Sequence, residues 1–130
     1  MYKIEKKDFG FKLTFAGFIQ LAEMQQWANE FGAEVQKLGG AKYGVLVDMT
    51  ELKPLPKDAQ EFMTQGQLAA RKGGMERSAV ILNDTIVMMQ FKRLAQESGI
   101  YNWERYFNAK DDPNYEAKAI DWIKNGVDPD

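Results

Sequence analysis

The chain opens with two short segments in which apolar and charged side chains alternate. Residues 2–5 follow this pattern, and residues 11–15 repeat it after turn signals at Asp8 and Gly10. A period of two is typical of a strand with one buried face. We therefore expect a β-hairpin at the start of the chain.

Helical spacing follows directly after the hairpin. From Leu21 to Leu38, apolar residues recur every three or four positions, which predicts an amphipathic helix that ends at Gly39. The same spacing predicts three more helices. The second begins at Pro56 and ends at Gly73, the third runs from residue 83 or 84 to residue 99, and the fourth from 112 to 126.

Three further segments have the composition of strands. Residues 43–47 form a continuous apolar run, which indicates a strand covered on both faces. Residues 78–82 read as another strand of the buried type, and residues 101–107 form an aromatic-rich run. The resulting order, ββαβαβαβα, predicts an α/β fold with a mainly parallel sheet, an N-terminal hairpin and helices packed on the sheet. No linker or repeat interrupts residues 1–130, so we expect a single domain with a frayed tail at residues 128–130.

The amino-acid composition excludes several kinds of chemistry. The chain has no cysteine and no histidine, which rules out disulfides, thiol catalysis, zinc–thiolate sites and a Ser–His–Asp triad. Neither a phosphate-binding loop nor an EF-hand is present. We therefore expect no metal and no cofactor, and a binding protein rather than an enzyme. The net charge of −2 provides no basic field, so we expect no nucleic-acid partner.

The sequence also bears on location in the cell. Its first residues lack the apolar core of a secretory signal, and no apolar run approaches the roughly 20 residues that span a membrane. We therefore expect a cytoplasmic protein. If it binds a membrane surface, it would lie at the periphery of the inner membrane.

Five segments are informative when taken together. They are LTFAGFI at residues 13–19, VLVDM at 45–49, LKPLP at 52–56, MQFKRLA at 89–95 and the pair Trp122-Ile123. With these segments and its order of elements, the chain resembles the SpoIIAA-like family of bacterial proteins. That family shares its fold with STAS domains and is likened to the CRAL-TRIO lipid-carrier domains. The resemblance implies a STAS-like fold and a role in binding.

The resemblance also implies an alternative role as a protein–protein regulatory module. STAS-type antagonists of anti-sigma factors are switched by phosphorylation of a serine at the start of the helix after the central strand. Here residues 56–59 read Pro-Lys-Asp-Ala, and the nearest hydroxyl, Thr50, comes several positions too early. The phosphoacceptor is therefore missing. We interpret Asp58 as a residue that complements the helix dipole, rather than as a fixed substitute for a phosphate.

The predicted third helix carries more apolar side chains than one face can bury. With about 100° of turn per residue and Phe91 at the centre of the buried face, Ile86 and Met89 point outward beside Arg93. The expected buried stripe comprises Val87, Met88, Leu94, Ala95 and Ser98. Apolar side chains beside a cation suit a protein partner or a membrane surface. Burial in a homodimer and chance exposure are the alternatives.

A second candidate region is the proline-rich loop at residues 52–56. It follows the central strand at the edge where open α/β sheets bind ligands, and Asn83 and Asp84 end the next strand at the same edge. Leu55, held between two prolines, is either the apolar lip of a cleft or part of a rigid lead into the second helix. Residues 53–93 carry seven basic and four acidic side chains, a net +3 that would favour anionic headgroups.

These observations predict a non-enzymatic module that binds a lipid, another amphipathic small molecule or a membrane surface. The residues expected to contact the ligand are Thr50, Lys53, Leu55, Pro56, Lys57, Ile86, Met89 and Arg93. A regulatory protein and a second copy of the chain are the alternative partners.

Overall fold

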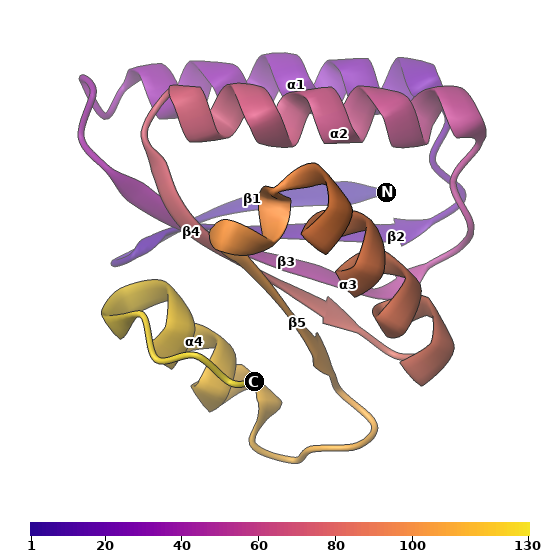
Figure 1. Cartoon of the computed structure of the whole chain (residues 1–130). Helices are drawn as coiled ribbons and strands as arrows, with labels where there is room; N and C mark the ends of the chain where they lie inside the picture. The colour runs from indigo at the N-terminus through magenta and orange to yellow at the C-terminus, as the bar shows by residue number, and fades with distance from the viewer.

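The secondary structure of the computed structural model, which describes residues 1–130, confirms the predicted order ββαβαβαβα (Figure 1). The strands are β1 (Tyr2–Lys7), β2 (Gly10–Gly17), β3 (Tyr43–Leu52), β4 (Met75–Leu82) and β5 (Glu104–Asn108). The helices are α1 (Leu21–Gln36), α2 (Lys57–Lys72), α3 (Thr85–Ser98) and α4 (Tyr115–Asn125), and a short 3-10 helix spans Ile100–Asn102.

The strands form one sheet in the order β1-β2-β3-β4-β5. β1 and β2 are antiparallel, as expected of a hairpin, and all other neighbours are parallel, which confirms the mainly parallel sheet. The register aligns one row of residues across four strands: Phe11, Val45, Ser78 and Glu104. Because side chains alternate along each strand, the members of this row point to the same face of the sheet.

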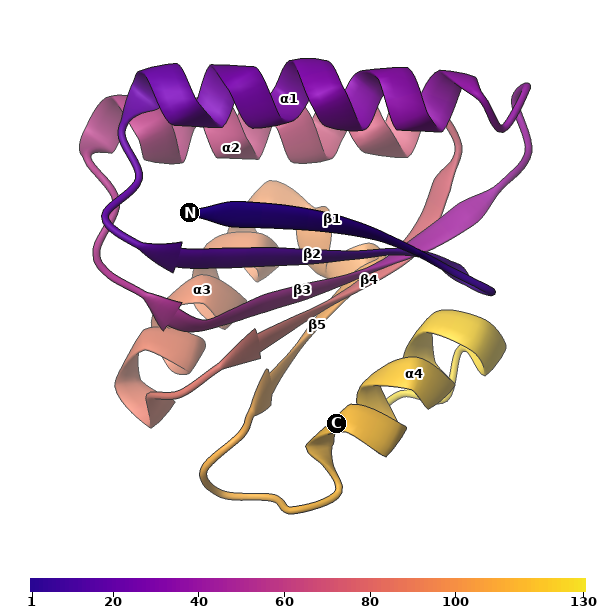
Figure 2. The same ribbon diagram turned by 180° about the vertical axis from the view of Figure 1, so that it is seen from behind.

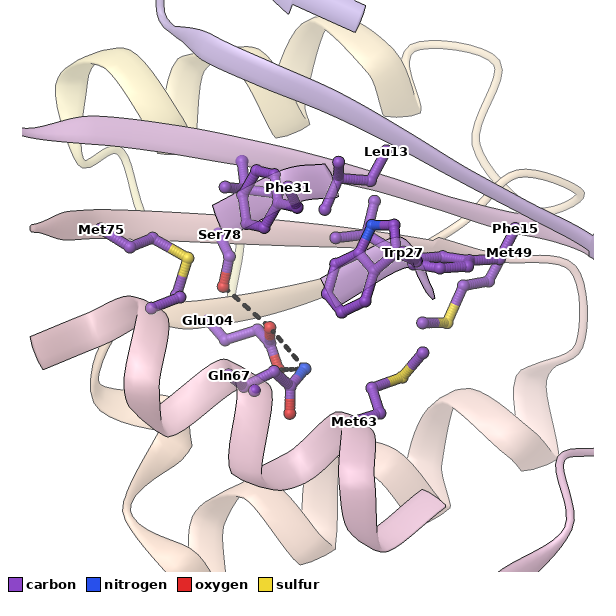
Figure 3. Close-up of a pocket in the computed structure, with 14 residues that line it drawn as sticks. Leu13, Phe15, Trp27, Phe31, Met49, Met63, Gln67, Met75, Ser78 and Glu104 are labelled. Carbon is purple, nitrogen blue, oxygen red and sulfur yellow. Dashed lines mark hydrogen bonds between the residues drawn. The ribbon is translucent and has the colours of Figure 1, made fainter. Parts of the chain in front are cut away.

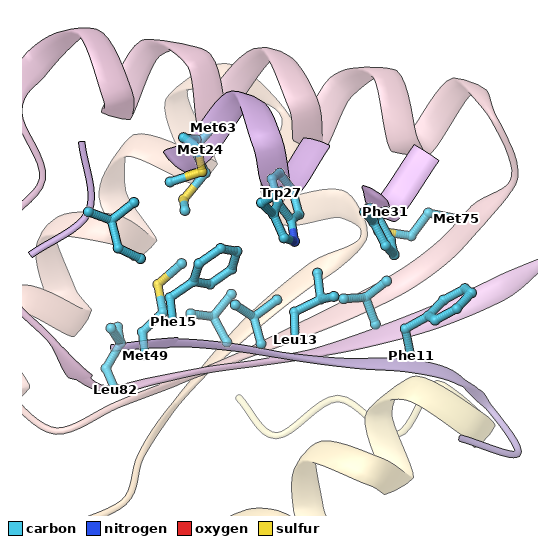
Figure 4. Packing of buried hydrophobic residues seen from close by; sticks show 14 of the residues in the cluster. Phe11, Leu13, Phe15, Met24, Trp27, Phe31, Met49, Met63, Met75 and Leu82 are labelled. Carbon is cyan, nitrogen blue, oxygen red and sulfur yellow. The ribbon is translucent and has the colours of Figure 1, made fainter. Parts of the chain in front are cut away.

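Helices cover both faces of the sheet. α1, α2 and α3 lie on one face and α4 lies on the other (Figure 1 and Figure 2). The buried apolar side chains accordingly form two clusters. The larger cluster lies under α1 and α2 (Figure 4). The smaller one joins α4 to the back of the sheet through Leu46, Ala79, Ile81, Phe107, Ala119, Trp122 and Ile123.

Aromatic rings fix α1 on the sheet. Trp27 and Phe31, one turn apart on this helix, stack with ring centroids 5.5 Å apart. Phe15 of β2 meets Trp27 edge-on at 5.2 Å, and Phe11 meets Phe31 in the same way at 5.3 Å. Each such pair contributes about 0.5–1.5 kcal/mol beyond the burial of its surface. The ring of Trp27 is therefore in contact with Phe15 on the sheet and with Phe31 on its own helix.

The last strand is shorter than predicted. It begins at Glu104 rather than at Tyr101, because residues 100–102 form a turn of 3-10 helix after α3. Likewise, α4 begins at Tyr115 rather than at Asp112. The Asp112 carboxylate accepts the Asn114 N–H at 2.8 Å, which holds these residues in a turn before the helix.

The buried face of α3 is narrower than predicted. Ala95 is buried, and Met88 and Phe91 are half-buried against the larger core cluster. Three residues that were expected in the buried stripe are exposed instead: Val87, Leu94 and Ser98. The reason is that α3 lies at the edge of the sheet, where it packs mainly on β5 and the 3-10 helix, so only a narrow stripe of it is covered.

The C-terminal residues, for which a frayed tail was expected, take part in two ion pairs. Asp128 pairs with Arg105 through two hydrogen bonds, at 2.9 Å to Nε and 3.1 Å to Nη2. Asp130 pairs with Lys92 of α3 at 2.9 Å. Arg105 is itself buried against the ring of Trp122. The hydrogen bond from Arg105 lowers the pKa of Asp128 to about 2, so the pair persists in mild acid.

Candidate functional site

A small apolar hollow, called the central cavity below, lies between the α1–α2 pair and the sheet (Figure 3). Its volume is about 40 Å³, and ten of its 14 lining residues are hydrophobic. Its apolar wall includes Leu13 and Phe15 of β2, Trp27 and Phe31 of α1, Met49 of β3 and Met63 of α2. The period of two along each strand and of about 3.6 along each helix turns these side chains toward one space.

Two small residues of α2 leave this space unfilled. Met63, Gly66, Gln67 and Ala70 line the cavity from one face of the helix, at the spacing of three or four residues that a single face requires. A Cβ atom placed on Gly66 would lie 3.8 Å from the Trp27 ring, an ordinary van der Waals distance. The hollow therefore results from short side chains on α2 opposite large ones on α1.

One carboxyl group lines the central cavity. Glu104, the first residue of β5, is only 1% exposed. Its Oε1 accepts hydrogen bonds from Ser78 Oγ at 2.8 Å and Gln67 Nε2 at 3.2 Å (Figure 3), and its Oε2 accepts one from Tyr106 Oη at 2.5 Å. Burial raises the pKa of Glu104, and the hydrogen bonds from Tyr106 and Ser78 offset only part of this increase.

Tyr106 shares the buried environment of Glu104. The two residues alternate with Arg105 along β5, so they point to the same face of the sheet. Burial raises the pKa of the Tyr106 hydroxyl, and the neighbouring Glu104 carboxyl raises it further. The phenol therefore keeps its proton and remains a hydrogen-bond donor to the carboxyl group.

The wall of the central cavity also contains an unpaired polar atom. Trp27 is 7% exposed and its Nε1 has no hydrogen-bond partner, and the nitrogen is turned toward the sheet (Figure 4). A buried donor without a partner costs about 1–3 kcal/mol. Tyr101 Oη and Trp103 Nε1 are likewise buried without a partner, but of the three residues only Trp27 lines the central cavity.

Other parts of the structure offer less to a ligand. No three acidic side chains converge where they could hold a metal ion. None of the helices has the length and the apolar character that a membrane span requires.

A second hollow, of about 260 Å³, opens at the start of β3 and β4, and its charged side chains bind other parts of the protein. There Lys124 pairs with Asp8 at 2.7 Å, and Arg77 donates to the Ile123 carbonyl at 3.2 Å, near the end of α4.

The residues predicted to bind a ligand do not converge on one place. Thr50 points away from the central cavity, and its hydroxyl donates to Asp48 at 2.7 Å. Alternation along β3 puts Thr50 and Asp48 on the face opposite to Val47 and Met49. The amide of Asn83 does reach the Thr50 carbonyl, at 3.5 Å, as expected for adjacent parallel strands that end at the same edge.

The proline-rich loop packs on the core. Leu55 and Pro56 are half-buried, Leu55 lies against the larger core cluster, and neither residue lines the central cavity. Lys53 and Lys57 are exposed. Pro56 is the N-cap of α2, an arrangement that favours the loop as a rigid lead into the helix. In the first turn, the Asp58 carboxylate accepts the N–H of the next residue at 2.8 Å, consistent with its predicted position at the helix dipole.

The three predicted contacts on α3 point outward, as helical spacing predicts. Ile86 is 70% exposed, Met89 is 62% exposed, and Arg93 is exposed on the same face. They lie on α3, which contributes no residue to the central cavity. The structure thus separates two regions, an outer face of α3 that the sequence indicated and an inner cavity that it did not.

Glu104 was not among the residues predicted to contact a ligand. A signal for it exists in residues 103–107, where two charged side chains stand among aromatic ones. With alternation, Glu104 and Tyr106 face one side of the strand and Arg105 and Phe107 face the other. A charge at a buried position of a strand is a sign of a functional or paired group.

No model of a protein family matches the sequence, and no curated protein matches it. Among solved structures, the chain is similar to an uncharacterized protein from Shewanella loihica PV-4, which is described as a member of the DUF3478 family with a SpoIIAA-like fold. The TM-score is 0.68, the sequence identity is 19%, and the match covers 95% of this chain and 92% of the other. The SpoIIAA-like fold expected from the sequence is therefore confirmed.

Proposed function

We propose that this protein binds a small apolar or amphipathic molecule in the central cavity and does not transform it. The observation that carries the proposal is an apolar hollow with one buried carboxyl group in its wall. Protein cores are ordinarily filled to crystal-like density with few voids, and charged groups inside them are ordinarily paired. The unpaired Nε1 of Trp27 in the same wall adds to the case.

The wall is suited to binding rather than to catalysis. It has no histidine, lysine or cysteine that could act as a base or nucleophile beside Ser78. Ser78 is 1% exposed, and its hydroxyl donates a hydrogen bond to the Glu104 carboxyl at 2.8 Å. We therefore assign both residues to recognition and not to a reaction.

Ligand entry requires the wall to move. A cavity of about 40 Å³ holds only a few atoms as it stands. Met49, Met63 and Met75 all line it, and methionine adapts its shape more readily than branched apolar side chains do. Their rearrangement provides room for the apolar body of a ligand.

The matched substitutions Ala70→Leu and Ala69→Leu test this proposal. Ala70 lines the central cavity, whereas Ala69, its neighbour on α2, is exposed. Leucine at position 70 should fill the hollow and abolish binding of 1-hexanol, measured by titration calorimetry. Leucine at position 69 should leave the affinity within about twofold of the wild type, since typical surface substitutions change stability by less than about 0.5 kcal/mol.

Two results would contradict the proposal. One is binding of 1-hexanol by Ala70→Leu with the affinity of the wild type. The other is a wild-type protein that binds neither this alcohol nor its longer homologues. Overpacking at position 70 costs about 1–3 kcal/mol, so near-ultraviolet circular dichroism should accompany the titration to show that the variant is folded.

A second candidate function is attachment to an anionic membrane through the outer face of α3. The observation that favours it is the exposure of Ile86 and Met89, two large apolar side chains beside Arg93. Large apolar residues next to a cation are typical of helices that lie on a membrane surface.

Sedimentation with anionic vesicles at low salt tests the second candidate. The double variant Ile86→Glu/Met89→Glu should lose at least about tenfold in vesicle binding, because two charges replace the side chains that would enter the membrane. The control is Gln25→Glu/Gln26→Glu, which adds the same charge on the exposed part of α1. Equal sedimentation of both double variants and the wild type would contradict membrane attachment through α3.

A further inference from the structure

The Glu104 carboxyl lacks a counter-charge. The lining of the central cavity contains no lysine and no arginine. The three groups that donate to Glu104 are neutral: the hydroxyls of Ser78 and Tyr106 and the amide of Gln67. Buried charges in proteins are ordinarily paired, since an isolated one is strongly disfavoured in an apolar environment. The fold therefore holds a carboxyl group that is hydrogen-bonded but has no cation beside it.

Two arginines that could have paired with Glu104 bind other groups instead. Arg71, one turn after Gln67 on α2, donates to the carbonyls of residues 75 and 76 at 2.9 and 3.0 Å. Arg105 adjoins Glu104 in the chain, but its side chain points to the opposite face of the sheet and pairs with Asp128. Neither forms an ion pair with Glu104, so the position for a cation next to this carboxyl stays open on the cavity side.

The hydrogen bonds on Glu104 are of unequal strength. Ser78 and Tyr106 donate at 2.8 and 2.5 Å, whereas Gln67 Nε2 is shared between the two oxygens at 3.2 and 3.4 Å. Two carboxylate oxygens together have about four acceptor positions, and the contacts of Gln67 use two of them, so a stronger donor could take its place. Gln67 belongs to α2, the same helix whose small residues shape the cavity, and its long bonds are the ones that a ligand would replace.

We propose that Glu104 selects apolar ligands that carry a primary ammonium group, which would bind between the carboxyl and the position of Gln67. This inference rests on the proposed function of the central cavity and specifies its ligand class. The ammonium group supplies both the missing positive charge and N–H donors, while the apolar body lies among the aromatic and methionine side chains. Charge-assisted hydrogen bonds are about twice as strong as neutral ones, so the charge should decide the selection.

The test compares n-hexylammonium with 1-hexanol, two probes with the same apolar chain, by titration calorimetry at neutral pH. The wild type should bind the ammonium compound at least about tenfold more tightly, as expected for one charge-assisted hydrogen bond. In Glu104→Gln this preference should disappear, while 1-hexanol still binds. If Glu104→Gln does not fold, the comparison of the two probes in the wild type still tests the inference.

The outcomes separate this inference from the function on which it rests. Equal wild-type affinities for the two probes would overturn the selection of ammonium ligands but leave the cavity as a binding site. A preference that persists in Glu104→Gln would also overturn it, because the charge would then be recognised elsewhere. If neither probe bound the wild type, both the proposed function and this inference would be wrong.

Discussion

Replacing Glu104 with glutamine should make the protein more stable than the wild type above about pH 5, by a margin that grows with pH. Burial raises the pKa of Glu104 in the folded protein, so the folded state holds this proton more tightly than the unfolded state does. Between the ordinary pKa of a glutamate and the raised one, the unfolded chain has released the proton and the native protein has not. Over that range, the free energy of unfolding of the wild type falls as pH rises.

The expected size of the effect follows from proton linkage. A single group contributes at most about 1.4 kcal/mol per pH unit, and the contribution stops growing above the raised pKa. Glutamine cannot ionise. Its oxygen can accept the hydrogen bond of either Ser78 or Tyr106, which reach different oxygens of Glu104, and its NH2 group can donate to the other hydroxyl. Carboxyl groups with lowered pKa values, such as Asp128, change stability in the opposite direction. They are present in both proteins, so they cancel in the difference.

Urea unfolding of the two proteins from about pH 4 to about pH 9 would measure this difference. The control is Glu61→Gln, which changes an exposed glutamate on α2 and should give a difference that does not vary with pH. A difference between Glu104→Gln and the wild type that stays constant over the whole range would show that the carboxyl is not penalised by burial. The case for an uncompensated charge in the central cavity would then fail.

The architecture could be predicted because local patterns decide it. Residues 43–47 and 79–82 are apolar without interruption, and both became parts of interior strands of a parallel sheet. Asp84 and Gly99 bound α3 as predicted, the first by accepting the Val87 N–H at 2.9 Å and the second by a φ of 86°. Each of these features depends on residues close together in the chain.

Predictions failed where contacts between distant residues decide the structure. Leu94 has the spacing of a core residue but is 58% exposed, because α3 lies at the edge of the sheet and is covered on a narrow stripe only. The tail contacts β5 through the pair between Asp128 and Arg105, which are 23 positions apart. The spacing of apolar residues along one helix does not show how wide a surface the rest of the protein offers to that helix. It also does not show which ion pairs form with other elements.

The candidate site was missed for the same reason. Trp27 falls within the amphipathic helix predicted from Leu21 to Leu38 and is buried, but its unpaired Nε1 depends on what lies opposite it in the fold. Ser78 and Glu104 meet because β4 and β5 are adjacent in a particular register. The sequence indicated the outer face of α3 because exposure of Ile86 and Met89 follows from spacing alone. A cavity arises between elements and cannot be derived from any one of them.

The indole N–H signal of Trp27 should move strongly when n-hexylammonium is added. Its Nε1 is buried, has no partner and belongs to the wall of the central cavity, so a ligand there changes its surroundings directly. The chain has three tryptophans, whose indole signals can be assigned with single Trp→Phe variants. Trp122 provides the internal comparison, since it belongs to α4 on the other face of the sheet and its Nε1 already donates to the Ser78 carbonyl at 2.9 Å.

A nitrogen-15 NMR titration of the wild-type protein therefore tests the existence of a ligand site in the central cavity most directly. We expect a saturable shift of the Trp27 signal, a much smaller one for Trp122, and no saturable shift of Trp27 in Ala70→Leu. A Trp27 signal that stays in place at ligand concentrations that saturate binding by calorimetry would contradict the account.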